Sequence, residues 1–188
     1  MKPWIQNVSL ADIKKGHHID AGFNSMLIQI VDPAMEFPTP MYHFREVYQF
    51  EFLDLEETDT TIDEDFKISD QQAAELVRLL KRAEDEHMNV VVHCVAGVCR
   101  SGAVCEVGVM MGFRDTEVFR SPNLLVKHKM MKCLGWTYDE NEPHTINGYT
   151  TESGIIVPAK AVDYNNDNEK VFTLADERRE RRLRKGET

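Results

Sequence analysis

The sequence has no apolar run of the kind that crosses a membrane, and its start, MKPWIQNVSL, lacks the apolar core of a secretion signal. A membrane-spanning helix needs about 20 predominantly apolar residues. A signal peptide carries an apolar region directly behind a basic start. We therefore expect a cytoplasmic protein with no membrane partner.

Basic residues are also scarce relative to acidic ones. The 188 residues include 22 Lys and Arg against 32 Asp and Glu, so the formal net charge is -10. Such a chain repels the phosphate backbone of nucleic acids and an anionic lipid surface. General nucleic-acid binding is therefore not expected, although a locally positive pocket can still bind a single anion.

The four cysteines form no CxxC pair, and no second Cys or His cluster completes a set of zinc ligands. Without a secretion signal, free thiols are expected rather than disulfides. The sequence thus predicts neither a metal nor an organic cofactor. The residues concerned are Cys94, Cys99, Cys105 and Cys133.

Alternating and β-branched apolar residues predict strands over Ile5–Val8, Met26–Val31, Val47–Asp54 and Val90–Val92. A capping-box pair, Ser69 with Gln72, predicts a helix that ends around 86–89. Further helical patterns follow at 103–113 and 123–135. This order predicts an α/β fold, with a central, mostly parallel sheet flanked by helices.

The segment after the Val90–Val92 strand predicts an anion site. A loop between the carboxyl end of a strand and the start of a helix points backbone N–H groups at one place, where the helix dipole is positive. Such a field favours the thiolate form of Cys94. Arg100 can hold two phosphate oxygens with its planar fork. Gly97 allows a tight turn, and the Ser101 hydroxyl can reach the Cys94 sulfur.

Residues 93–101, HCVAGVCRS, resemble the H-C-x-x-G-x-x-R-S/T signature of the protein tyrosine and dual-specificity phosphatase superfamily. The resemblance implies a compact phosphatase fold and a phosphoprotein substrate, with Cys94 as nucleophile and Arg100 as phosphate clamp. His93 and Ser101 would support the loop. The implied phosphate-binding residues are Val95, Ala96, Gly97, Val98, Cys99, Arg100 and Ser101.

A broader resemblance extends from about Ile5 to Gly135. FLD at 52–54, VVHC at 91–94 and SPNLLV at 121–126 are similar to compact bacterial and phage-type predicted tyrosine phosphatases. We therefore expect a phosphatase domain over 1–138. Residues 139–188 are expected to form a peripheral extension, with one apolar patch and a charged, solvated or disordered tail.

The resemblance also implies an aspartate that protonates the leaving group. Asp54, Asp59 and Asp63 lie 40, 35 and 31 residues before Cys94. The F-x-D pattern at a strand end favours Asp54, whereas the shorter spacing of small dual-specificity enzymes favours Asp63. Asp54 is our first choice, then Asp63, then Asp59. Each could instead cap a turn, a common use of Asp in loops.

Several alternatives stay open from the sequence. Cys99 could form a disulfide with an oxidised Cys94, although a packing role is preferred. The chain could be a pseudophosphatase that captures phosphoproteins, or another cysteine enzyme with an anion loop, such as a rhodanese or arsenate reductase. The loop positions between Cys94 and Arg100 carry no basic side chain, which favours a substrate with one phosphate. Phosphotyrosine and phosphoserine or phosphothreonine are not distinguished, and no oligomeric state is predicted.

Overall fold

The computed structural model describes residues 2–60, 62, 64–138, 144–146, 149–151 and 155–156. The chain divides into two compact units, Met1–Met130 and Met131–Thr188. The first unit contains every candidate site residue named above. Each unit is described by itself.

The first unit is built on a parallel sheet. Among the described residues the sheet has five strands in the order β3-β2-β4-β1-β5. All the neighbouring strands pair in parallel, with Ser9 of β1 opposite Cys94 of β4 and Gln29 of β2 opposite His93. The carboxyl ends of the strands therefore meet at one edge. The strands are β1 (Trp4–Ser9), β2 (Ser25–Val31), β3 (Glu46–Glu51), β4 (Asn89–Cys94) and β5 (Arg114–Asp115).

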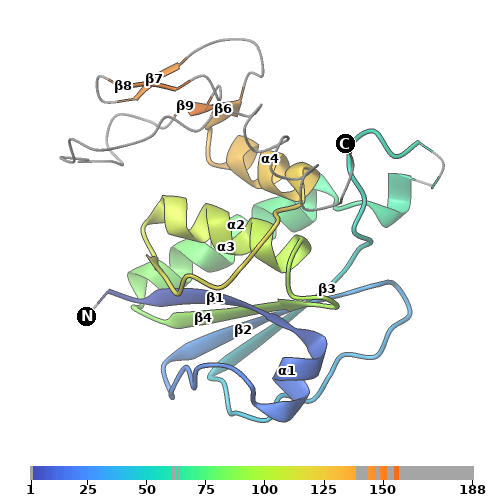
Figure 1. The fold of residues 1–188 in the computed structure, drawn as a ribbon, viewed down its shortest axis with the longest axis vertical. Helices are drawn as coiled ribbons and strands as arrows, with labels where there is room; N and C mark the ends of the chain where they lie inside the picture. The colour runs from blue at the N-terminus through green and yellow to red at the C-terminus, as the bar shows by residue number, and fades with distance from the viewer. Residues whose placement is uncertain are drawn as a thin grey trace. The chain divides into compact units, whose positions relative to one another are not determined.

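Helices lie on both faces of this sheet (Figure 1). The short helix α1 (Leu10–Lys15) covers one face, and α2 (Asp70–Asp85) and α3 (Arg100–Met111) cover the other. The helix α4 (Leu124–Cys133) follows a loop that runs from β5. The arrangement confirms the predicted α/β class with a parallel sheet flanked by helices.

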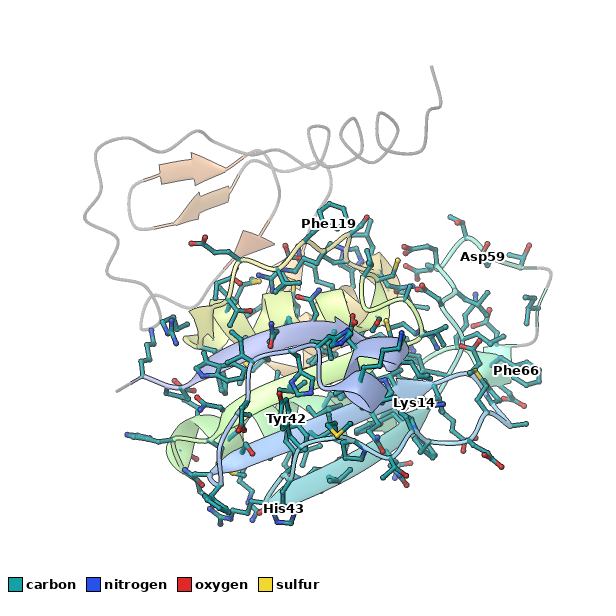
Figure 2. The ribbon with its side chains drawn as sticks, turned by 60° about the horizontal axis from the view of Figure 1, so that its bottom comes forward. Lys14, Tyr42, His43, Asp59, Phe66 and Phe119 are labelled. Carbon is teal, nitrogen blue, oxygen red and sulfur yellow. The ribbon has the colours of Figure 1, made fainter. Side chains whose placement is uncertain are left out.

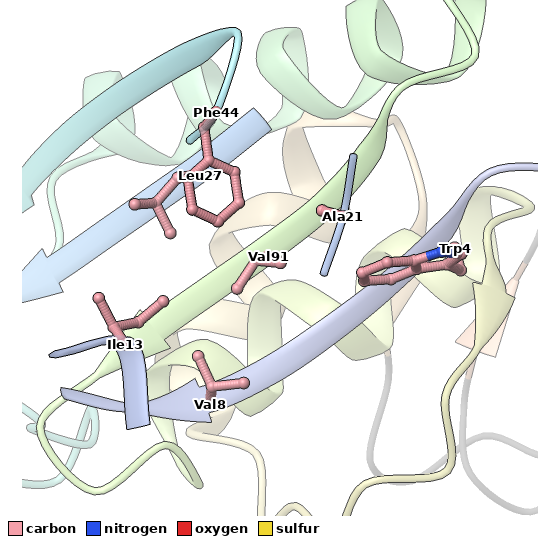
Figure 3. Packing of buried hydrophobic residues seen from close by; sticks show 7 residues of the cluster. All are labelled: Trp4, Val8, Ile13, Ala21, Leu27, Phe44 and Val91. Atoms are coloured by element: carbon pink, nitrogen blue, oxygen red, sulfur yellow. The ribbon is translucent and has the colours of Figure 1, made fainter. Parts of the chain in front are cut away.

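An apolar cluster fills the space between α1 and the sheet (Figure 3). Its members come from strands, from loops and from α1 itself, and Ile13 of α1 and Val91 of β4 are completely buried. Full burial of such a side chain contributes about 1.5–3 kcal/mol to folding. The cluster therefore stabilises the packing of α1 against the sheet. Its members are Trp4, Val8, Ile13, Ala21, Leu27, Phe44 and Val91.

The opposite face packs closely against α2 and α3. Leu76, Leu79 and Leu80 of α2 are fully buried. A Cβ at Gly108 of α3 would lie 2.7 Å from Cδ1 of Ile5 in β1, which is closer than real Cβ contacts allow. This glycine lets α3 approach the sheet and sets the position of the helix that begins at Arg100.

Most long elements match the sequence predictions. The Ser69–Gln72 capping box is formed, and α2 starts directly after it. Strand β3 ends at Glu51 rather than at Asp54, because the chain leaves the sheet after the Phe52 N–H bonds to the Val31 carbonyl. The prediction did not include α1, β5 or the 3-10 turn Glu64–Phe66. These elements are too short to show a helical or alternating period.

The second unit contains four short strands among the described residues: β6 (Thr137–Tyr138), β7 (His144–Ile146), β8 (Tyr149–Thr151) and β9 (Ile155–Ile156). β6 pairs with β9 and β7 with β8, both antiparallel. The predicted boundary after residue 138 stays a prediction, and most of the predicted extension and charged tail lies outside the described residues. Within the described part of the chain, no helix is both long and apolar enough to span a membrane.

Candidate active site

The predicted anion loop connects the central strand β4 to α3. β4 ends at Cys94 and α3 begins at Arg100, so the loop proper is Val95–Cys99. Its carbonyls are held by neighbouring segments: Leu10 N donates to Val95 O at 3.3 Å, and Ser121 N donates to Val98 O at 3.2 Å. The loop is therefore fixed on both sides by backbone contacts.

Gly97 is required at the centre of this loop. Its φ is +73°, in the left-handed region that favours glycine. A Cβ there would overlap the backbone of Val8 and Ser9 at the end of β1. The Gly97 carbonyl accepts a hydrogen bond of 2.8 Å from Nδ2 of Asn7, and the same nitrogen donates to Phe119 O at 3.0 Å. Strand β1 thus supports the loop through this hydrogen bond and through close packing against Gly97.

Within the described part of the chain, the residue at the N-cap of α3, Cys99, makes no capping hydrogen bond with its side chain. In contrast, Ser9 caps α1 and Ser69 caps α2, and a Glu56 carboxylate oxygen accepts from the first backbone N–H groups of α4. The first N–H groups of any helix lack partners within the helix and attract anions. The N-terminus of α3 is therefore available for an anion at the predicted place.

Cys94 and Ser101 lie together at this position. The Cys94 residue is 1% exposed, and its Sγ is 3.2 Å from Oγ of Ser101. This distance confirms the predicted approach of the hydroxyl to the sulfur. A hydroxyl donor stabilises a thiolate, both before nucleophilic attack and when the sulfur leaves.

Arg100 is held firmly at one end of its guanidinium. The residue is 3% exposed, and its Nη1 donates to Phe52 O at 2.6 Å and pairs with Oδ1 of Asp32 at 2.6 Å. Its Nε is buried and has no hydrogen-bond partner within the described part of the chain. A guanidinium held in this way keeps one edge for a phosphate.

His93 is completely buried beside the loop. Burial, and to a smaller degree the charge of Arg100, lowers the pKa of its ring from 6.5 to about 4, against the opposing effect of the Cys94 backbone. The ring is therefore neutral at physiological pH. A neutral, buried ring fits the supporting role expected for His93 and does not fit a proton donor.

Two of the three candidate acids, Asp54 and Asp59, lie in the described part of the chain. Asp54 is exposed, and its Oδ1 accepts a hydrogen bond of 2.9 Å from Nδ2 of Asn123. The backbone N–H of Asn123 donates to the carbonyl of Cys99 in the anion loop at 3.1 Å. Asn123 therefore connects the loop of Asp54 directly to the loop of Cys94.

Asp59 shows no such connection within the described part of the chain. Oδ2 of Asp59 accepts the backbone N–H of Glu56 at 2.7 Å, so this carboxylate caps a turn. Asp59 lies toward the outer part of the loop after β3 (Figure 2). Asp63 lies outside the described residues. Of the two candidates that the structure describes, Asp54 is the one connected to the anion loop, and the choice between Asp54 and Asp63 stays a prediction.

The cysteines form no disulfide, and all four lie in the described part of the chain. Cys99 is partly exposed at the start of α3, so a redox role stays a prediction. Burial raises the pKa of the Cys105 thiol above its usual range. Within the described residues no group of three or more His, Cys, Asp and Glu side chains is arranged to hold a metal ion.

Three residues that support the anion loop and Arg100 lie outside the phosphatase signature. Asp32 directly follows the buried strand β2, and Asn7 is a polar residue inside the buried strand β1. A polar residue at such a position is a usable signal, because parallel strands end at the same edge of the sheet. Asn123 lies in the segment SPNLLV at 121–126, but the phosphatase signature gives it no role. Its importance depends on contacts that no sequence pattern shows.

Fold and site together define an α/β protein with a strand–loop–helix anion site that carries a cysteine and an arginine. The family model for protein-tyrosine phosphatase matches residues 42–141, more than half of the chain. The chain therefore belongs to the protein-tyrosine phosphatase family.

The solved structures that are similar to this chain include OH1 and Tk-PTP. OH1 from the Orf virus, a tyrosine phosphatase with triple substrate specificity, is 25% identical, with a TM-score of 0.38; the match covers 57% of this chain and 55% of OH1. Tk-PTP in its active form is 15% identical, with a TM-score of 0.39; the match covers 70% of this chain and 79% of Tk-PTP. The chain thus spans about half the length of OH1. No curated protein matches.

Proposed function

We propose that this protein hydrolyses phosphotyrosine-type phosphomonoesters of proteins through a cysteinyl-phosphate intermediate. The observation that carries the proposal is the start of α3, which the side chain of its N-cap residue does not cap. The loop before it also brings together Cys94, Ser101 and the Nε of Arg100, which has no hydrogen-bond partner among the described residues. Such a site attracts a phosphate dianion and offers it a nucleophile.

In the first step the Cys94 thiolate attacks phosphorus, and the bond from phosphorus to the ester oxygen breaks. Asp54 gives its proton to the leaving oxygen, so that a neutral alcohol or phenol departs. Arg100 and the loop N–H groups stabilise the charge on the three remaining phosphoryl oxygens.

In the second step water attacks the phosphorus of the cysteinyl-phosphate, and Asp54 accepts a proton from it. The bond between phosphorus and sulfur breaks, inorganic phosphate is released, and Cys94 returns as a thiolate that is stabilised by Ser101. No metal ion takes part in either step.

The loop side chains support a substrate with one phosphate. Val95, Ala96 and Val98 carry no charge, and Val95 is 39% exposed. An additional phosphate group on the substrate would need further basic side chains.

The test is hydrolysis of p-nitrophenyl phosphate in EDTA by the wild type, by Cys94→Ser and by Cys133→Ser. Cys133 is an exposed cysteine outside the site, so its variant is the matched control. We expect metal-independent turnover in the wild type and the control, and none in Cys94→Ser. Equal activity of the wild type and Cys94→Ser would exclude the cysteinyl-phosphate mechanism. Oxyanion binding without turnover would favour a phosphate-binding pseudophosphatase.

A further inference from the structure

Asp32 contacts the phosphate-clamp arginine from a neighbouring strand. It is the first residue after β2, and β2 lies beside β4 in the sheet. Its Oδ1 is 2.6 Å from Nη1 of Arg100. The arginine side chain is 4% exposed, whereas that of Asp32 is 38% exposed. The carboxylate thus reaches from the surface to a guanidinium that is otherwise buried.

A second acceptor fixes the same nitrogen. Nη1 of Arg100 also donates to the carbonyl of Phe52, which follows β3. Phe52 N donates to Val31 O at 3.2 Å, which keeps the ends of β2 and β3 together. Two adjacent strands therefore place two oxygens on one end of the guanidinium. Because the group is planar, these two contacts also set the direction of its other edge.

The other edge includes Nε, which is buried without a partner within the described residues. A buried N–H of a charged group needs an acceptor, since leaving it unsatisfied is costly. An oxygen of a tetrahedral oxyanion bound at the start of α3 would supply that acceptor. Asp32 and the oxyanion would then occupy different edges of Arg100 rather than compete for one.

We propose that Asp32 is a positioning residue that orients Arg100 toward the phosphate of the substrate. The proposal rests on the function proposed above. An arginine side chain has several rotatable bonds, and holding it in one orientation before binding removes an entropic cost from the binding step. Asp32 would therefore strengthen oxyanion binding, although it carries a negative charge itself.

The test is calorimetric binding of tungstate, a tetrahedral oxyanion, to the full chain and its variants. We expect Asp32→Ala to weaken binding about 10-fold, the size expected for a lost charge-assisted contact. Asp32→Asn keeps an oxygen acceptor and should lose less. Asp85→Ala removes the same charge at the end of α2, just before β4 begins, and should bind as the wild type does.

A double-variant cycle separates positioning from a general structural role. In an Arg100→Lys background the fork is absent, so Asp32→Ala should change tungstate binding less than 2-fold if it acts through Arg100. An equal loss in both backgrounds would show a structural role and overturn the proposal. Unfolding midpoints in urea establish that each variant is folded. If Asp32→Ala does not fold, Asp32→Asn replaces it in the cycle.

Binding that is unchanged or tighter in Asp32→Ala would also overturn the proposal, because it would show that Asp32 competes with the oxyanion. The assay does not require turnover. Wild-type hydrolysis with no dependence of binding on Asp32 would refute the positioning role alone. Asp32-dependent binding without hydrolysis would refute the proposed function alone, and no binding by the wild type would refute both.

Discussion

The side-chain amide of Asn123 donates to the carboxylate of Asp54 at 2.9 Å, and it also donates to Leu55 O at 2.9 Å. Asn123 is 2% exposed, and its Oδ1 accepts the backbone N–H of Val126 in α4. The buried side chain of Asn123 therefore joins the loop of the proposed acid to α4. Its backbone N–H joins the same loop to Cys99 of the anion loop.

Replacing Asn123 by alanine should misorient the proposed acid. We expect kcat to fall about 10-fold with phenyl phosphate, whose leaving group needs a proton, and much less with p-nitrophenyl phosphate. Asn89→Ala is the matched control, because Asn89 also joins two backbone segments but lies at the other end of β4. Equal losses with both substrates would contradict the assigned role of Asn123.

The choice among the three aspartates can be made by kinetics. We expect Asp54→Ala to lower kcat about 100-fold or more and to abolish the fall of activity at alkaline pH, as removal of a general acid does. Asp59→Ala should lose only a turn-capping bond. If Asp63→Ala, and not Asp54→Ala, abolishes this pH dependence, then Asp63 is the acid.

The Ser101 hydroxyl should matter most when the sulfur leaves phosphorus. We expect Ser101→Ala to slow breakdown of the intermediate about 10- to 100-fold, the effect of one hydrogen bond to a charged group. Rapid-mixing experiments should then show a burst of p-nitrophenol followed by slow turnover. A variant without a burst, whose first turnover is slowed to the same degree, would place the role of Ser101 in the attack step.

Gly97→Ala should disrupt the anion loop. The substitution combines a left-handed backbone with overlap against Val8 and Ser9. Gly22 has a similar φ of +75°, but a Cβ there meets nothing within 4 Å. Gly22→Ala therefore measures the backbone strain alone, expected to be about 1–2 kcal/mol. Urea unfolding and tungstate binding should show a larger loss for Gly97→Ala, and equal losses would refute the packing argument.

The buried His93 predicts a specific dependence of stability on pH. Its pKa in the folded protein, about 4, lies below its value of 6.5 in the unfolded chain, so the unfolded state takes up a proton first as the pH falls. Stability from this residue is present above pH 6.5 and is lost as the pH falls toward 4. We expect a loss of about 2 kcal/mol between pH 7 and pH 5.

The measurement is urea unfolding of the wild type and of His93→Asn at pH 7 and pH 5. Asparagine does not titrate in this range, so the variant should lose about 2 kcal/mol less than the wild type over this interval. The same slope in both proteins would show that other groups, and not His93, cause the dependence.

The long elements of the fold could be predicted from the sequence, because their signals are local. The capping box before α2 and the β-branched run of β4 each lie within a few residues. The end of β3 could not be predicted. Residues 47–54 keep their alternation beyond the point at which the chain leaves the sheet, so the pattern alone does not mark Glu51 as the last strand residue.

The residues of the anion loop could be predicted from the sequence alone, because Cys94, Gly97, Arg100 and Ser101 lie within eight consecutive positions and a strand–loop–helix path brings them together. The partners of these residues were decided by the tertiary structure. Phe52 lies 48 residues from Arg100, and Asp54 lies 69 residues from Asn123. Such contacts form when parallel strands end at one edge, and the order of strands in a sheet depends on packing that no local pattern encodes.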